Sequence, residues 1–301
     1  MPAALLLLAC PQLPHLLPPL EPVPARPEQA AWSVFQEAAA DGTLAAGEGD
    51  TLAALGGTSE PVLIHAWLAG SPTEHRLASL LAAGCAEDSP LALAALHGAW
   101  RIRDEGASLA ALLAPASFPP AAWPVLAWLA LDSERPLSVR AAACGRLLRA
   151  GCRGAWPVAR SILRTGTALD EQAPWADWNR LGRYELPKRL LVLDLDALFA
   201  AAGEAPSGFE PNAAWSRQEE QLAALEPRIE RLLAGRPPLA DRGLARGVAV
   251  LLRADGPERE RAWRAAALLA PHSLPILELA LTKQDPVLVQ AARRALELLP
   301  R

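Results

Sequence analysis

The sequence is poor in the residues from which metal sites and disulfide frameworks are built. Only 4 of its 301 residues are cysteine, none of them forms a C-x-x-C pair, and no Cys/His cluster has the spacing of a zinc site. Cys85 and Cys144 lie in apolar, alanine-rich stretches that are typical of buried, unreactive thiols. We therefore predict neither a bound metal nor a cofactor.

Motifs of known catalytic sites are also missing. The sequence contains no G-x-S-x-G, no H-E-x-x-H and no glycine-rich phosphate loop. Its five histidines are scattered along the chain, which predicts surface or core positions rather than a ligand set. They are His15, His65, His75, His97 and His272. We predict a protein that is not an enzyme.

No long apolar run is free of proline. Residues 106–131 carry no charge, yet Pro115, Pro119, Pro120 and Pro124 divide them into pieces far shorter than the ~20 residues of a membrane span. Two buried helices joined by a proline-containing turn are the expected structure.

The first 27 residues have two interpretations. Leu7 to Cys10 loosely resembles the end of a bacterial lipoprotein signal, but Met1 and Pro2 supply no positive charge before the short apolar run. Residues 11–27 then contain seven prolines, which predicts an extended tether. Cys10 is the candidate lipidation site of a membrane-tethered form. The alternative, a cytoplasmic protein with a short apolar start, is favoured.

Positive charge is not in excess. The net charge is −4, and the first 150 residues carry 8 Lys+Arg against 14 Asp+Glu, which argues against a general affinity for nucleic acid. Lys188 and Lys283 are the only lysines, so nearly every basic side chain is arginine. A coding bias and an arginine-rich binding surface both explain this.

What the chain has in abundance is alanine and leucine. It is 51% hydrophobic, so it has the means to bury a large core, and its ten Trp, four Phe and one Tyr make up only 5%. Ala and Leu are strong helix formers, whereas the residues favoured in strands are few. The composition predicts an all-α fold.

The sequence repeats itself. Residues 129–148 align without a gap to residues 279–298, and shorter or weaker copies begin near 60, 88 and 255. Each copy has an acidic residue near a proline, then apolar or small residues three and four apart, as in Leu137, Ala141, Cys144 and Leu148. This pattern predicts a helix, a polar turn and a second helix that begins near the proline. Such helix pairs bury their apolar faces by stacking side by side.

At "RPLSVRAAACGRLL" and "QDPVLVQAARRALELL" the chain resembles the HEAT-repeat family of armadillo-like α-solenoids. The resemblance implies an α-solenoid of irregular HEAT-like antiparallel helix pairs, which we expect over 28–164 and 217–301. It implies the fold rather than an activity, because the family is defined by shape.

The repeated sequence pattern is absent over residues 165–216. There we predict an irregular, Trp-rich insertion with loops at 165–185 and 203–213 around a helix at 186–202. Insertions into a solenoid often carry its binding surface. The candidate partner-binding residues are Trp175, Asp177, Trp178, Arg180, Arg183 and Tyr184. The alternative is that the tryptophans only fill space between misaligned repeats.

Two patterns next to these residues are assigned to structure. Asp194 and Asp196 suggest a phosphatase motif, but their segment reads as a helix, on which residues two apart point about 200° from each other. In residues 216–233, Ser216 is the expected N-cap, with Glu219 at the capping-box position. Pro227 is expected to kink or divide that helix.

Three functions are consistent with these observations. The leading one is a non-catalytic scaffold that binds another protein through its helical-repeat surface. The second is a DNA glycosylase-like enzyme on the same fold, which would use Trp, Asp and Arg side chains near 175–189. The third is an envelope assembly lipoprotein anchored at Cys10.

Overall fold

The protein is all-α over the residues that the structure describes. The computed structural model describes residues 14–20, 27–40, 59–83, 85, 90–165 and 178–299. These contain fourteen α-helices and no β-strand, with one isolated β-bridge between Cys85 and Pro115. The predicted fold class, an all-α stack of antiparallel helix pairs, is confirmed.

Most helices are short, between 8 and 13 residues. In the first half they are α1 (Gln29–Ala40), α3 (Ser59–Ala69), α4 (Pro72–Leu81), α5 (Pro90–Arg101), α6 (Glu105–Leu113), α7 (Trp123–Leu131) and α8 (Leu137–Arg149). In the second half they are α9 (Trp156–Leu163), α11 (Trp178–Ala201), α12 (Trp215–Ala234), α13 (Arg242–Leu252), α14 (Arg259–Leu268), α15 (Leu274–Leu281) and α16 (Pro286–Glu297). The described part of the chain also contains four 3-10 turns that precede or join these helices: η1 (Pro14–Leu16), η3 (Pro120–Ala122), η4 (Arg153–Ala155) and η5 (Gly256–Glu258).

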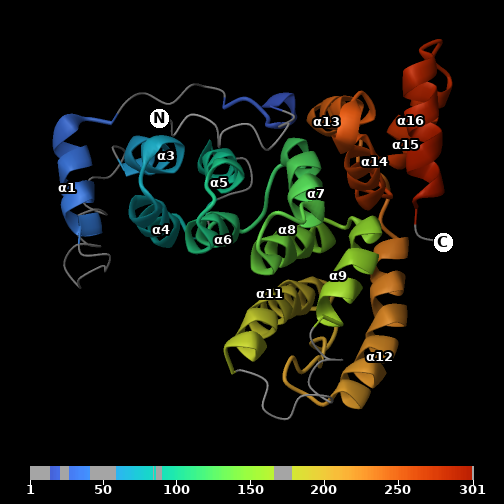
Figure 1. The fold of residues 1–301 in the computed structure, drawn as a ribbon, viewed down its shortest axis with the longest axis horizontal. Helices are drawn as coiled ribbons and strands as arrows, with labels where there is room; N and C mark the ends of the chain where they lie inside the picture. Colours follow the sequence, from blue (N-terminus) through green and yellow to red (C-terminus); the bar gives the residue numbers. More distant parts are fainter. Residues whose placement is uncertain are drawn as a thin grey trace, which may run out of the picture.

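The helices pair in sequence order and stack in a row. The pairs α3/α4, α5/α6 and α7/α8 follow one another, and α13/α14 and α15/α16 continue the row on the far side of α7 (Figure 1). The first helix α1 packs against α3 and α4. Each pair therefore buries its faces against its neighbours, as expected of a helical repeat.

Three helices leave the row at α8. The long helix α11 packs along α8, α9 contacts both, and α12 lies beside α9 (Figure 1). The row itself continues through α7, which contacts α13 and α14. The α7/α8 pair is thus a branch point from which α9, α11 and α12 form a side group.

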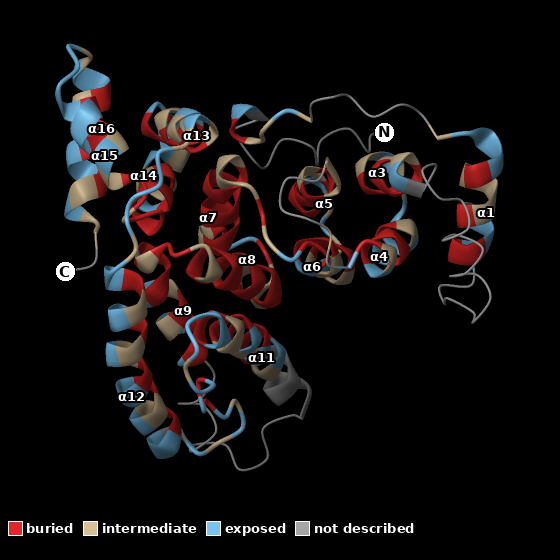
Figure 2. Ribbon diagram, turned by 180° about the vertical axis from the view of Figure 1, so that it is seen from behind, coloured by how far each residue is buried: buried red, intermediate tan, exposed pale blue. Residues whose placement is uncertain are grey.

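The core is densest at this branch point. Every residue from Trp123 to Ala130 on α7 is buried, and so is every residue from Ser138 to Leu148 on α8 except Arg140 (Figure 2). The α8 segment 141–144 reads Ala-Ala-Ala-Cys, and all four are fully buried. Small side chains let neighbouring helices approach closely, so α8 can contact helices on several sides.

The turns between paired helices follow the repeated pattern. Asp285 caps α16: its side chain accepts hydrogen bonds from the backbone N–H groups of Val287 and Leu288, and Pro286 occupies the first turn. At the aligned turn before α8 the cap is absent, because the residue before Pro136 is Arg135. The Arg135 guanidinium instead donates to backbone carbonyls near the end of α5.

The expected pair of helices in 106–131 is confirmed as α6 and α7. They are joined by a proline-containing segment that ends in η3. Among the described residues, no helix combines the length and the apolarity needed to cross a membrane.

Two helix boundaries were predicted wrongly. The helix expected at 186–202 begins at Trp178, so the predicted loop at 165–185 is too long, and Pro187 lies inside α11. The helix α12 starts after Ala214, so Ser216 is not its N-cap, and α12 continues through Pro227 to Ala234. A proline inside a helix removes one hydrogen bond. The helix α12 buries apolar side chains before and after its proline, and α11 buries them after its proline, and that burial outweighs the loss.

The predicted N-terminal tether is described only in part. Within residues 14–20 the chain forms η1, which contacts α13, and the Leu16 side chain is buried. His97 on α5 makes a 2.8 Å hydrogen bond to the carbonyl oxygen of Pro18. This piece is therefore packed against the helix row rather than free. Cys10 lies outside the described residues.

Candidate functional site

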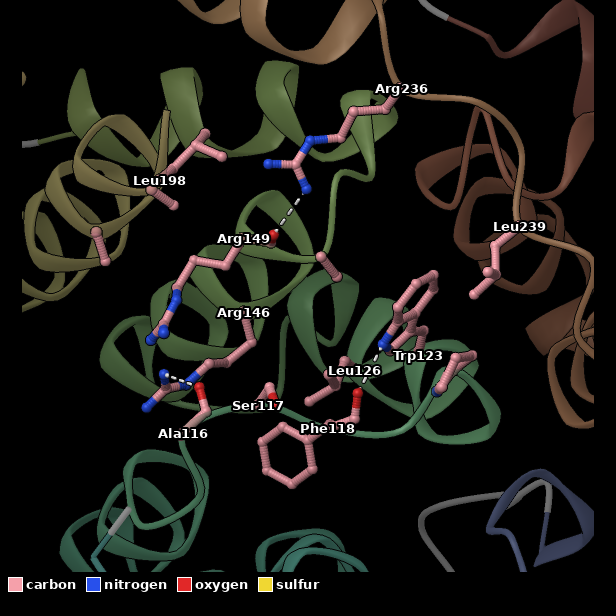
Figure 3. A pocket seen from close by; sticks show the side chains of 14 residues that line it. Ala116, Ser117, Phe118, Trp123, Leu126, Arg146, Arg149, Leu198, Arg236 and Leu239 are labelled. Carbon is pink, nitrogen blue, oxygen red and sulfur yellow. Dashed lines mark hydrogen bonds between the residues drawn. The ribbon is translucent and has the colours of Figure 1, made fainter. Parts of the chain in front are cut away.

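A cavity of about 380 Å³ lies where α7, α8, the end of α11 and the segment after α12 meet (Figure 3). Its basic side chains are Arg146 and Arg149 from α8 and Arg236 from the segment after α12. Its apolar walls include Phe118, Trp123, Leu126, Leu198 and Leu239. The cavity therefore lies at the branch point of the fold.

Arg146 holds the floor of the cavity together. Its Nε and Nη2 donate to the carbonyl oxygens of Leu112 (3.2 Å) and Leu113 (3.1 Å), and Nη1 donates to that of Ala116 (3.3 Å). The carbonyls at the end of a helix have no partner within it, so this guanidinium caps the C-terminus of α6. Since all three nitrogens are used, Arg146 has a structural role.

Asp194 on α11 is the buried counter-ion of Arg146 and Arg149 on α8. Its Oδ1 lies 3.4 Å from Nη1 of Arg146 and 3.3 Å from Nη1 of Arg149. Burial raises the pKa of this carboxyl group, and the two guanidinium groups oppose that rise. Room for the carboxylate exists because residue 145 is glycine: a Cβ there would lie 2.3 Å from Oδ2 of Asp194.

Arg149 and Arg236 keep hydrogen-bonding capacity for a ligand. Nη1 of Arg236 donates to the carbonyl oxygen of Arg149 (3.2 Å), and Nη1 of Arg149 faces Asp194. Among the described residues, no other hydrogen bond engages the remaining nitrogens of these two side chains. The backbone at Gly151 has φ +91°, a conformation that favours glycine. A Cβ at this position would lie 2.7 Å from Cδ of Arg236, so the glycine also leaves room for the Arg236 side chain.

The aromatic wall is held in place by hydrogen bonds. Nε1 of Trp123 donates to the carbonyl oxygen of Phe118 (3.0 Å), and the Trp123 ring lies 5.1 Å from that of His272. The backbone N–H of Leu239 donates to Nδ1 of His272 (3.1 Å). The wall is therefore preorganised, and its two rings are largely covered: Trp123 is 5% and Phe118 is 3% exposed.

This arrangement can bind an anion that carries an apolar group. Guanidinium groups stay charged at all physiological pH values and present several N–H donors in one plane, which suits carboxylate and phosphate oxygens. In Figure 3 the Arg236 guanidinium is turned toward the backbone carbonyl of Arg149, whereas the Arg149 side chain runs toward Arg146, so the two groups line different parts of the cavity.

The residues predicted to bind a partner lie elsewhere. Trp178, Arg180, Arg183 and Tyr184 fall in the first turns of α11, where Tyr184 is half-buried. The cavity is at the other end of that helix, at Leu198, about 20 to 30 Å away along its axis. Trp175 and Asp177 lie outside the described residues.

The two aspartates of the apparent phosphatase motif lie on a helix, as predicted. Asp194 pairs with arginines, whereas Oδ1 of Asp196 accepts a hydrogen bond from the backbone N–H of Ser207. They face different partners, so they do not form a shared site.

The sequence contained only a weak indication of the arginine cavity. Arginines in the last turn of a helix are common, because they suit its dipole, and Arg149 is at such a position. Arg236 is 87 residues further along the chain and follows a different helix. Only the packing of α8 against α11 and of the segment after α12 brings these groups together.

Comparison with known proteins identifies no relative: no family model, no curated protein and no solved structure matches the chain. Within the described residues, no group of three or more His, Cys, Asp and Glu side chains is arranged to hold a metal ion.

Proposed function

We propose that this protein is a non-catalytic binding module, in which a stack of helix pairs holds an arginine-lined cavity for an anionic group of a protein partner. The observation that carries the proposal is the pair Arg149 and Arg236, whose unused N–H groups border a cavity of about 380 Å³ with apolar walls. Guanidinium groups recognise anions and do not exchange protons near neutral pH, so this lining is suited to recognition.

An apolar stripe on α11 supports a protein as the partner. Leu186, Leu193 and Ala197 are seven and four residues apart and thus share one face of the helix. The Leu186 and Leu193 side chains are 43% and 66% exposed, and Ala197 lines the cavity. A partner segment along α11 would cover this stripe and place an acidic group in the arginine-lined cavity. The residues predicted from the sequence at 175–184 would then contact a part of the partner segment that lies farther from the cavity.

The charge of the molecule favours such a partner over nucleic acid. The net charge is −4, and two guanidinium groups in a small cavity provide no extended basic surface along which a phosphate backbone could lie. The scaffold hypothesis is therefore retained, and the glycosylase-like alternative becomes an outcome of the test.

The test is capture of a partner from the native cell by the tagged full chain and by three variants. The double variant Arg149→Gln, Arg236→Gln and the single variant Leu193→Glu should each lose a partner that the unmodified chain retains. The matched control is Arg253→Gln, because Arg253 is exposed and does not line the cavity. Circular dichroism establishes that each variant is folded.

The proposal is supported if the double arginine variant and Leu193→Glu both lose the partner while Arg253→Gln retains it. Equal capture by all variants would overturn it. Binding of duplex DNA at low salt that the double variant abolishes would also overturn it, in favour of the nucleic-acid alternative.

A further inference from the structure

The segment that joins α12 to α13 forms one wall of the cavity and is held by few contacts. It covers residues 235–241, and its Arg236 and Leu239 side chains line the cavity (Figure 3). The two residues before Leu239 are prolines, which have no N–H to donate. Among the described residues, the N–H of Leu239 makes the only backbone hydrogen bond that involves residues 237–240. The position of the segment therefore depends on the group that accepts this bond.

The acceptor is Nδ1 of His272, which lies 3.1 Å from the Leu239 nitrogen. His272 is in the turn between α14 and α15 and is 4% exposed. Because a backbone N–H can only donate, Nδ1 must carry no proton, and the ring proton of the neutral imidazole is assigned to Nε2. The segment is thus bound to a titratable group, in a geometry that requires the uncharged ring.

We propose that protonation of His272 releases residues 235–241 from the fold and thereby opens the cavity at acidic pH. A protonated imidazole has an N–H on both ring nitrogens and accepts no hydrogen bond. Nδ1 of His272 and the backbone nitrogen of Leu239 would then be two donors directed at each other. The contact that now holds the segment would therefore repel it, and the backbone N–H would be left without a partner unless it moves into water.

A positive charge beside the ring increases this effect. The Arg236 guanidinium acts on His272 as a like charge. A Cβ built at Gly151 would lie 3.1 Å from Nη1 of Arg236 and 3.3 Å from Nε2 of His272, so both side chains border the same space at this glycine. Because Arg236 belongs to the segment, release of the segment separates the two positive charges.

The other groups around His272 supply no compensating negative charge. From α7 comes the uncharged Trp123 ring, at 5.1 Å. The turn after α8 contributes backbone carbonyl groups, and the Cys152 thiol in that turn stays neutral because burial raises its pKa. The Asp241 side chain, at the end of the segment, accepts from the Leu244 N–H at the start of α13. Among the described residues, no carboxylate is one of the groups that act electrostatically on the ring.

The pH range of the release follows from the two states of the segment. While the segment is bound, burial lowers the pKa of His272 below its ordinary value. Once the segment is released, water reaches the ring and its pKa returns to about 6.5. Above that pH the ring is neutral in both states, and below it the released state binds the additional proton and is favoured. At pH 5.0 this factor reaches about thirtyfold at most.

The consequence for binding rests on the proposed function, whereas the release of the segment does not. Release withdraws Arg236 and Leu239 from the cavity, while Arg149 remains on α8. The full chain should therefore capture its partner at pH 7.5 and lose it at pH 5.0.

The test of the release is amide hydrogen exchange of the full chain, corrected for the intrinsic exchange rate at each pH. We expect exchange at Leu239 to become at least about tenfold faster between pH 7.5 and pH 5.0. NMR of the five histidine rings shows whether His272 takes up its proton over the same range. Its signal is the one that is missing in the variant His272→Asn.

Variants link the response to this imidazole. In His272→Asn the amide oxygen can accept from the Leu239 N–H near the position of Nδ1 and takes up no proton, so the acceleration should disappear. His75→Gln is the matched control, because His75 is also buried with a lowered pKa but lies in α4, and the acceleration should persist in it. If His272→Asn does not fold, Arg236→Gln is the second test: loss of the like charge should raise the pH at which His272 is protonated.

The outcomes separate this inference from the proposed function. The inference is wrong if His272 stays neutral down to pH 5.0, if exchange at Leu239 does not change while His272 is protonated, or if His272→Asn shows the same acceleration. None of these measurements needs a partner. If the segment is released as expected but capture at pH 5.0 equals that at pH 7.5, the inference stands and the proposed role of Arg236 in binding fails.

Discussion

Arg146 and Arg149 are one turn apart on α8, and their surroundings assign them different roles. The side chain of Arg146 is 8% exposed and donates to three backbone carbonyls, whereas that of Arg149 is 34% exposed and lies at the edge of the cavity. Asp194 contacts both and is therefore the residue that connects the core to the candidate site. Residue type alone does not distinguish these arginines; burial and partners do.

The glycine that makes room for Asp194 leads to the first prediction. Gly145→Ala should destabilise the protein by about 2 to 4 kcal/mol, because the new Cβ would lie 2.3 Å from Oδ2 of Asp194 and would force the buried carboxylate away from its arginines. Urea denaturation measures this loss. Gly235→Ala is the control, because a Cβ there meets nothing within 4 Å. Equal stability of both variants would contradict the packing described for Asp194.

The second prediction concerns the thiols. Burial raises the pKa of Cys144 to about 12 and also raises the pKa of Cys152, and both side chains are fully buried. Because only the thiolate reacts, neither should be alkylated in the native protein at pH 8. Cys85 is half-buried and should react before them. Peptide mass spectrometry after alkylation gives the order, and equally fast modification of Cys144 would refute it.

At the scale of single elements, the length of the long helices is determined by the elements against which they pack. Pro187 lies inside α11 and Pro227 inside α12, although proline usually ends a helix. In α12 the buried side chains Leu222, Leu225 and Ile229 lie on both sides of the proline. Burial of each such side chain contributes roughly 1.5 to 3 kcal/mol, which is enough to offset one lost hydrogen bond.

Helix caps provide the third prediction. Asp285→Ala should cost about 1 kcal/mol, because the Asp285 carboxylate accepts from two backbone N–H groups at the start of α16. Ser216→Ala should change the stability by less than about 0.5 kcal/mol, although its sequence context predicts a cap, because α12 begins at Trp215. Chemical denaturation of the two variants side by side is the measurement. A larger loss for Ser216→Ala would restore the capping role predicted from the sequence.

At the scale of the whole molecule, the row of helix pairs and the side group share one core at α7 and α8. The first pairs reach α8 through α6, the last pairs reach α7 through α13 and α14, and α11 packs on α8. The N-terminal segment adds a connection, because η1 contacts α13 while Pro18 accepts a hydrogen bond from α5. Unfolding is therefore expected to be more cooperative than in a linear stack, where each repeat contacts only its neighbours.

The fourth prediction is that stability falls as the pH decreases from 7.5 to 5.5. Burial lowers the pKa of His75, His97 and His272 below 6.5. In the unfolded chain these imidazoles take up protons at about pH 6.5, so below that pH the unfolded state binds more protons and is favoured. The stabilisation that comes from these buried, neutral imidazoles is fully present above about pH 6.5. It is lost progressively as the pH falls, until the imidazoles of the folded protein themselves become protonated.

Thermal unfolding at several pH values measures the effect, for which we expect a loss of about 1 to 2 kcal/mol. His75→Gln should make the stability less dependent on pH, because a glutamine side chain takes up no proton in this range. Its amide can still donate to the Trp67 carbonyl oxygen, which His75 now contacts at 2.7 Å. His15→Gln is the control, because His15 is exposed. Stability that is flat over this pH range would show that the folded protein accommodates charged imidazoles.

The sequence alone determined the class of fold and the position of most paired helices. Alanine and leucine at helical spacing, and an acidic residue near a proline at each turn, are local signals, because they act within one or two turns of a helix. The helix pairs at 123–149 and 274–297 follow from them. The tertiary structure decided where the row branches, why α11 and α12 continue through proline, and which arginines meet. These depend on contacts between residues far apart in the chain, such as Arg149 with Asp194 and Arg236, whose energies no local pattern contains.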